Sequence, residues 1–91
     1  MELKQLEVFS EELNFAVVRM PGRRFPGCVI QGDSLSVLCG LARSIHNRLA
    51  SQGDDEASED AAELLEKLTD RLEHYEQVLA KHGIHLPHAK S

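Results

Sequence analysis

Three of the five histidines recur near the end of the chain at every third position, as His82, His85 and His88. Neutral imidazoles at close spacing are good ligands for zinc, nickel or copper. This run, however, crosses an expected helix end at Gly83 and a proline at Pro87, so it does not place three rings on one face. We interpret the run as a solvated tail, with metal binding as the alternative, and we predict no metal site and no cofactor.

Cys28 and Cys39 are the next candidates for chemistry. A cysteine nucleophile needs a thiolate beside a base, and no histidine or lysine is placed next to either residue in the sequence. Cys28 falls in an expected strand and Cys39 beside an apolar stripe, so both are interpreted as reduced, partly buried core residues. Gly32-Asp33 lacks the further glycines and the lysine of a phosphate-binding loop. The sequence therefore predicts no catalytic residue and no enzyme.

Acidic residues are concentrated in one segment of the chain. The net charge is −5, and between Asp54 and Glu66 there are seven acids and no lysine or arginine. Such a segment repels nucleic acid, whereas it attracts and steers a basic protein. We therefore predict a partner-binding surface for a basic protein at Asp54, Asp55, Glu56, Glu59, Asp60 and Glu63. The plain alternative is an ordinary solvated helix face.

Arg23 and Arg24 form a second candidate surface, in a turn between two breakers, Pro21-Gly22 and Phe25-Pro26-Gly27. Two guanidinium groups held by rigid flanks could bind a phosphate or a carboxylate. We include both arginines among the partner-binding residues. Binding of a small ligand by this loop, or of a metal by the terminal histidines, is the alternative function.

The elements that must position these residues follow from turn signals and apolar periodicity. Strands are predicted at about 3–9, 14–20 and 28–31. The first rests on the alternation of Leu6 and Val8 with Glu7, and the other two on β-prone runs that are followed by Pro21 and Gly32. Asp33 is expected to cap a helix from about 34 to 51, and Ser58 to cap a second from about 58 to 82. The tail 85–91 is expected to fray.

Each expected helix has one apolar stripe at helical spacing. In the first, the stripe is formed by Leu35, Leu38, Ala42, Ile45 and Leu49; in the second, by Ala61, Leu65, Leu68, Leu72, Tyr75 and Leu79. A short linker makes the two helices antiparallel. We predict a single α+β domain over 1–91, with a small antiparallel sheet of two or three strands packed against an antiparallel pair of helices.

The segment 14–50 resembles the N-terminal domain of HicB-type antitoxins. The resemblance rests on a β-run before Phe25-Pro26-Gly27-Cys28, followed by Val29-Ile30-Gln31-Gly32-Asp33-Ser34-Leu35 at the start of an amphipathic helix. It implies a partial RNase H-like fold that binds and blocks a small basic RNase toxin. The family's C-terminal DNA-binding segment has no counterpart here, so no nucleic-acid binding is expected. The whole chain also looks like small bacterial proteins of an uncharacterised family that share an R-R-F-P-G…Q-G-D-S-L core.

These observations together predict a non-catalytic bacterial protein that neutralises or regulates a basic protein partner, such as a toxin. The N-terminus has charges where a signal peptide needs an apolar centre, and no apolar run approaches 18 residues. We therefore expect a cytoplasmic protein that does not interact with membranes. An uncovered edge strand could also pair in a homodimer.

Overall fold

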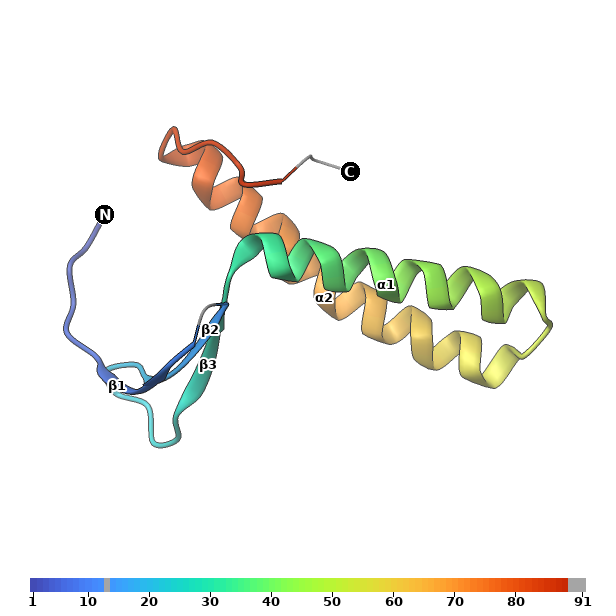
Figure 1. Ribbon diagram of the computed structural model, residues 1–91, viewed down its shortest axis with the longest axis horizontal. Coiled ribbons are helices and arrows are strands. Elements are labelled where there is room, and N and C mark those ends of the chain that lie inside the picture. The colour runs from blue at the N-terminus through green and yellow to red at the C-terminus, as the bar shows by residue number, and fades with distance from the viewer. Residues whose placement is uncertain (13, 89–91) are drawn as a thin grey trace. The chain divides into compact units, whose positions relative to one another are not determined.

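The computed structural model describes residues 1–12 and 14–88, which form three strands followed by two helices (Figure 1). The elements are β1 (Glu7–Glu11), β2 (Phe15–Arg19), β3 (Gly27–Ile30), α1 (Gly32–Ser51) and α2 (Asp55–Lys81). The predicted α+β class, with an antiparallel sheet and a pair of helices, is confirmed. The chain divides into two compact units, Met1–Gln31 and the part from Gly32 onward, which are described one at a time.

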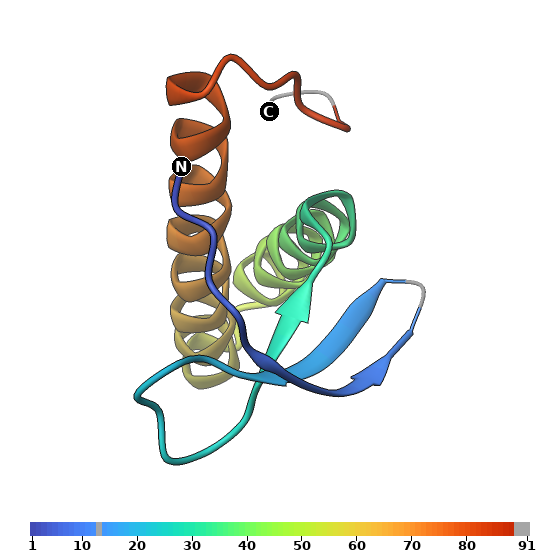
Figure 2. The same ribbon diagram turned by 90° about the vertical axis from the view of Figure 1, so that its left-hand side faces the viewer.

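The first unit is a three-stranded antiparallel sheet in the order β1-β2-β3 (Figure 2). β2 is the central strand, as its run of β-prone residues from Phe15 to Val18 predicts. Its pairing with β1 shifts by one residue between Val8 and Ser10, which leaves Phe9 in a bulge. The loop from β2 to β3 turns at Gly22, whose φ of 80° suits glycine.

The position of the first strand was predicted in part wrongly. β1 covers Glu7–Glu11 instead of 3–9, while β2 and β3 lie within one residue of their expected bounds. Alternation of apolar and polar residues around Leu6 and Val8 does not fix where a strand ends. The pairing with β2 fixes it, because Glu7 lies opposite Arg19 and forms an ion pair with it.

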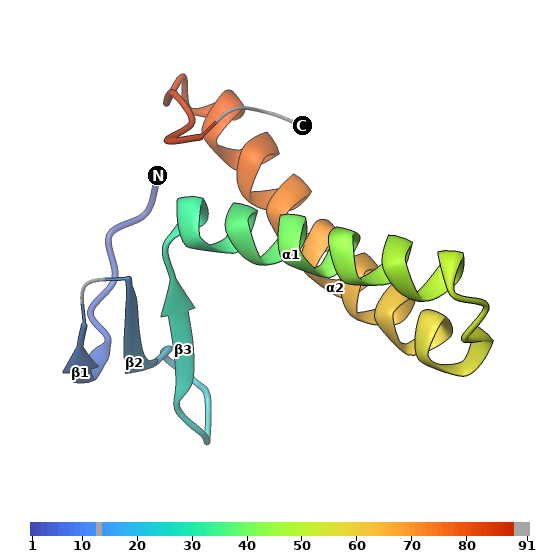
Figure 3. The ribbon, with the colours of Figure 1, turned by 45° about the vertical axis from the view of Figure 1, so that its right-hand side comes forward.

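The second unit is an antiparallel pair of long helices that lie side by side over much of their length (Figure 3). Their inner faces meet in a cluster of Leu35, Cys39 and Leu72, with Leu68 and Tyr75 packed against it. Ala42 and Ala61 are also buried nearer the connection. The apolar stripe predicted for α2 therefore faces α1, as expected from its spacing.

The stripe predicted for α1 is correct only in part. Leu35 and Ala42 are buried, but Leu38 and Ile45 are 40% and 51% exposed. Cys39, which is 2% exposed, takes the inward position next to Leu38. The reason is that α1 has two neighbouring apolar stripes, and the contact with α2 selects the one that contains Cys39.

The connection between the helices is made by only three residues, Gln52, Gly53 and Asp54. Gly53 has φ 76°, its amide donates to Ala50, and the amide of Asp54 donates to Leu49, which is a Schellman ending. The carboxylate of Asp54 then accepts from the amide of Ala57 at 3.1 Å, as the N-cap of α2. The prediction that Ser58 caps a helix starting at 58 is therefore wrong, since α2 starts at Asp55.

Two other expectations about helix ends are corrected. Asp33 is not the N-cap of α1, because the helix already begins at Gly32; its carboxylate accepts from the amide of Ser34 at 2.9 Å within the first turn. The tail is not frayed over 85–88, because His88 stacks on Tyr75 with ring centroids 6.3 Å apart. The remainder of the predicted frayed tail, 89–91, lies outside the described residues.

Candidate functional site

The acids selected from the sequence lie at the connection and in the first turns of α2. All six, Asp54, Asp55, Glu56, Glu59, Asp60 and Glu63, are exposed. They are held in place by the Schellman ending of α1 and by the rigid helix that begins at Asp55. The structure therefore brings these residues together on one end of the helix pair.

The acidic surface is longer than the sequence analysis proposed. Exposed acids recur along α2 at Glu56, Glu59, Glu63, Glu66, Asp70 and Glu73, with spacings of 3, 4, 3, 4 and 3 residues. This is the helical period, so the six side chains form one acidic stripe on the side of α2 that faces away from α1. The same spacing argument that found the apolar stripe would have found this one. Glu66 was counted in the acidic segment but not included in the predicted partner-binding set, and Asp70 and Glu73 lie beyond Lys67, where that segment was taken to end.

Not every acid in the predicted set is free to meet a partner. Asp54 is engaged in capping α2. Glu63 forms an ion pair with Lys67 at 2.8 Å, and the hydrogen bond from Lys67 lowers the pKa of the Glu63 carboxyl. In the described part of the chain, no ion pair involves Asp55, Glu56 or Glu59. These three carboxylates are therefore the strongest candidates for contact with a cation.

Asp60 points to a different side of α2 from the other acids. It lies one residue before the buried Ala61, whereas Glu59 and Glu63 lie two residues to either side of Ala61. A step of one residue turns the side chain by about 100° around a helix, which places Asp60 at the edge of the contact with α1. We therefore treat Asp60 apart from the acidic stripe.

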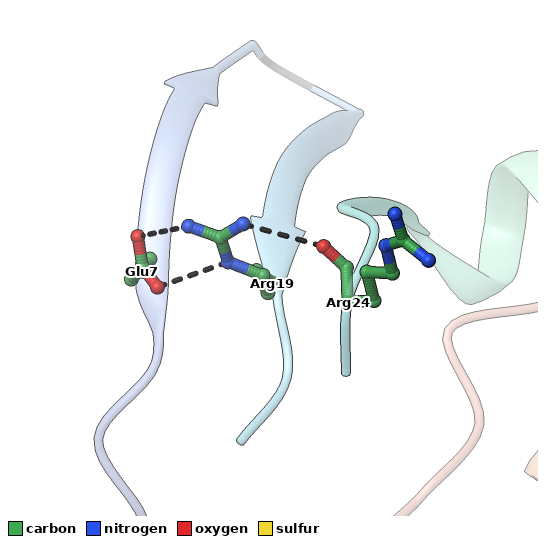
Figure 4. A network of polar contacts seen from close by, with 3 residues as sticks. All are labelled: Glu7, Arg19 and Arg24. Carbon is green, nitrogen blue, oxygen red and sulfur yellow. Dashed lines mark hydrogen bonds and ion pairs between the residues drawn. The ribbon is translucent and has the colours of Figure 1, made fainter. Parts of the chain in front are cut away.

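The two arginines of the predicted set lie in the loop between β2 and β3, in the first unit. Both are exposed, and the guanidinium of Arg24 stacks over the ring of Phe25 at 5.3 Å. The carbonyl of Arg24 accepts from Arg19 at 3.4 Å (Figure 4). Arg23 lines a hollow of about 320 Å³ together with Glu7, Arg19 and Met20.

Arg19 was not predicted as a site residue, although its guanidinium makes hydrogen bonds to both Glu7 and Arg24. Its guanidinium donates to both carboxylate oxygens of Glu7, at 3.0 and 2.8 Å (Figure 4), and stacks over the ring of Phe9 at 5.4 Å. The hydrogen bond lowers the pKa of Glu7 and raises the pKa of Arg19. Arg19 is already paired, whereas no ion pair within residues 1–12 and 14–88 involves Arg23, so Arg23 is the stronger candidate in this hollow for contact with an anion.

The three terminal histidines do not converge. His82 ends α2 and is exposed, His85 is exposed, and His88 lies 3.2 Å from Glu76. In residues 1–12 and 14–88, no group of three or more histidine, cysteine or acidic side chains is arranged to hold a metal ion.

The two thiols differ in exposure. Both are free, and Cys28 is exposed where a partly buried core residue was expected. Cys39 is buried, and its burial raises the pKa of the thiol. A raised pKa disfavours the reactive thiolate, so Cys39 acts as a core residue in the contact between the helices.

The comparisons with known proteins identify a family whose function is unknown. The chain belongs to a family of unknown function, DUF6959, whose model matches residues 1–88. No curated protein and no solved structure matches it. Separately, neither helix in the described ranges has an apolar stretch sufficient to cross a membrane.

Proposed function

We propose that this chain, as a member of a family that carries no assigned activity, is a non-catalytic binding protein that neutralises or regulates a basic protein partner. Antitoxins and toxin-immunity proteins act in this way, and the local resemblance of 14–50 to HicB-type antitoxins is in keeping with it. The observation that carries the proposal is the acidic stripe of α2, whose first carboxylates are exposed and free of ion pairs among the described residues.

The position of these acids on a helix suits binding more than it suits folding. Asp55 and Glu56 lie in the first turn of α2, where the helix dipole favours negative charge, but Glu66, Asp70 and Glu73 receive little from that dipole. Like charges spaced three and four residues apart repel one another by a few tenths of a kcal/mol per pair. A row of such pairs is therefore slightly destabilising in the free chain, and a cationic partner would relieve the repulsion.

The partner is expected to be a protein and not a nucleic acid. A duplex or single strand presents a dense row of phosphates, which the stripe repels. A basic protein meets a field of opposite sign, so its encounter with α2 is accelerated, and the acceleration weakens as salt screens the charges.

The experiment compares three forms of the chain as baits in a lysate of the source cell, followed by kinetics with the retained protein. The first is the unaltered chain. The second is the triple variant Asp55→Asn, Glu56→Gln, Glu59→Gln. The third is the control Glu66→Gln, Asp70→Asn, Glu73→Gln, which removes the same charge farther along the same face.

We expect a basic protein that binds the unaltered chain and associates at least about tenfold more slowly with the first triple variant at low salt. The control should slow association less, because its residues lie farther from the connection. Stopped-flow measurements at two salt concentrations provide the readout, and circular dichroism checks that the helices persist. An association rate equal for all three forms at both salt concentrations would show that the acidic stripe is an ordinary solvated face and does not contribute to binding.

A second function is favoured by the hollow beside Arg23. Arg23 lines this hollow, and its volume of about 320 Å³ suits a small anion such as a phosphate or carboxylate compound. Titration calorimetry with inorganic phosphate, before and after Arg23→Gln, tests it. Heat that disappears in the variant would support this function over protein binding.

A further inference from the structure

The helix pair carries an apolar face that α2 does not cover. On α1 it consists of Val37, Leu38, Leu41 and Ile45, which are 62%, 40%, 56% and 51% exposed, and on α2 of Leu64, which is 52% exposed. Ser34, Leu38, Leu41, Ile45 and Arg48 are spaced 4, 3, 4 and 3 residues apart. This spacing is that of a seam along which a further helix packs.

Leu38 and Leu41 on α1 and Leu64 on α2 lie on the same side of the pair, and Val37 lies at the outer edge of this face. Leu38 is one residue before the inward-facing Cys39, and Leu64 is one residue before the half-buried Leu65. One residue is a turn of about 100° around the axis, in the same sense on each helix. Because the helices are antiparallel and face each other, equal turns bring the two side chains to the same side.

The register between the helices makes this face continuous. The Cα of Gly32 lies under the ring of Tyr75, and Leu35 shares the core cluster with Leu72. Position 41 of α1 is therefore level with position 66 of α2, and Leu64 lies at the height between Leu41 and Ile45. We refer to Val37, Leu38, Leu41, Ile45 and Leu64 as the apolar face.

We propose that a second copy of this chain covers the apolar face, by a two-fold axis that passes beside Leu41. In this arrangement each α1 runs antiparallel to the partner's α1 and each α2 to the partner's α2, as a four-helix bundle. The proposal does not depend on the function proposed above, because the acidic stripe points away from this face.

The size of the apolar face suits this occupant. Five half-exposed aliphatic side chains form a patch on the order of 300–500 Å², which is as large as the largest patch on a typical monomer. A stable dimer buries about 800 Å² on each partner, with the apolar part at the centre and a polar rim. The apolar face provides that centre, and polar residues of both helices border it.

Two of the charges beside the apolar face, Asp60 and Arg71, are complementary to their own two-fold image; a third, Lys67, lies one residue before Leu68 and is ion-paired with Glu63 at 2.8 Å. Asp60 and Arg71 each lie one residue before an inward-facing position, Ala61 and Leu72, so both are on the same side as Leu64. The two-fold axis passes at the level of position 66 of α2, and Asp60 and Arg71 lie six residues before and five residues after that position. The two-fold axis therefore brings each Asp60 opposite the partner's Arg71, and each Arg71 opposite the partner's Asp60.

Both of these side chains are available for that contact. The guanidinium of Arg71 donates only to the backbone carbonyl of Lys67, at 2.8 Å, and no ion pair in the described ranges involves it or Asp60. On α1 the same axis brings Arg48, in the last turn, toward the partner's α1 N-terminus, which carries Asp33. Antiparallel helices also align their dipoles favourably.

The first experiment measures the mass of the chain in solution by sedimentation equilibrium over a range of concentrations. We expect the unaltered chain at twice its 10.2 kDa mass. Leu41→Glu, which places two carboxylates at the axis, should raise the dimer dissociation constant at least about tenfold. The control is Ile84→Glu, since Ile84 is 54% exposed but lies beyond the end of α2, and it should leave the dimer unchanged.

The second experiment exchanges the charged pair and does not rely on the apolar core. Asp60→Arg and Arg71→Asp should each weaken the dimer, because each places like charges opposite one another. The double variant should restore the dimer toward its original dissociation constant. Positions 60 and 71 are eleven residues apart on one helix, so the rescue cannot arise within one copy.

The outcomes separate the proposal from other occupants of the face. A monomer at about 100 μM chain concentration would overturn it. So would a dimer that Leu41→Glu leaves intact with its helical circular dichroism preserved, since the contact would then lie elsewhere, for example at an edge strand. Failure of the charge exchange to restore the dimer would overturn the antiparallel arrangement about Leu41.

Discussion

Gly32, the first residue of α1, shows why one glycine of the Q-G-D-S-L segment is required. A Cβ at this position would collide with the ring of Tyr75, which is itself held by the stack with His88. Gly40, in the same helix, has nothing within 4 Å of the place where its Cβ would be. Gly32 is therefore required for steric reasons, whereas Gly40 is not.

We predict opposite effects of the two glycine-to-alanine substitutions. Gly32→Ala should lower the free energy of unfolding by about 1–3 kcal/mol, because the Tyr75 ring must move. Gly40→Ala should raise it by up to about 1 kcal/mol, because alanine is the better helix former and the site is open. Denaturant unfolding of both variants under one condition measures the difference. Equal changes would mean that Tyr75 does not occupy the space above Gly32.

At the residue scale, the sequence allowed only part of this site to be predicted. Asp55, Glu56 and Glu59 could be proposed from the sequence, because they belong to a run of acids too numerous to be buried in so small a chain. That Cys39 and not Leu38 faces α2 could not be predicted from the sequence. Both positions fit helical spacing, and only the contact with α2 distinguishes them.

At the scale of elements, Asp54 stands out among the acids of the connection. It completes the ending of α1 through its amide and starts α2 through its carboxylate. Several residues near it can act as caps, among them Ser51, Asp55 and Ser58, so local preference alone could not select the right one. The left-handed turn at Gly53 makes the selection, because it places the residue that follows at the start of the next helix.

We predict that Asp54→Ala lowers the free energy of unfolding by about 1 kcal/mol, through loss of the N-cap. Asp55→Ala removes the same charge from the next residue but no cap, so it should cost only a few tenths of a kcal/mol through the helix dipole. Thermal or denaturant unfolding of the two variants provides the comparison. An equal loss would show that the charge matters at this end of α2 and that the hydrogen bond does not.

At the scale of the whole molecule, the two units differ in how much they bury. Among the described residues of Met1–Gln31, Val18 alone is buried, whereas the part from Gly32 onward has a cluster of buried residues around Cys39. Three short strands with so little buried surface are marginally stable. The class and order of these elements could be predicted from period and turn signals, but this imbalance could not, since composition counts apolar residues and not the partners that cover them.

We predict that this imbalance appears in hydrogen exchange. Amides inside α1 and α2 should exchange at least about tenfold more slowly than those of the three strands, because local opening of the sheet exposes less buried surface. Mass spectrometry of peptides from 7–30, 32–51 and 55–81 measures this. Equal protection of strands and helices would contradict the expectation, and would indicate that the sheet gains cover that its own side chains do not provide.

The three-residue connection also limits how the length of this chain can change. Gln52, Gly53 and Asp54 all take part in ending one helix or starting the next. A residue inserted among them would therefore disrupt one of the two helix ends. One residue inserted into α2 just after the cap would turn the rest of that helix by about 100° relative to α1. The leucines that meet α1 would then rotate out, and the residues one position earlier, among them Asp60, Lys67 and Arg71, would rotate in. The seven residues between β2 and β3 have no such consequence, so a tag, a label or an inserted peptide belongs in that loop.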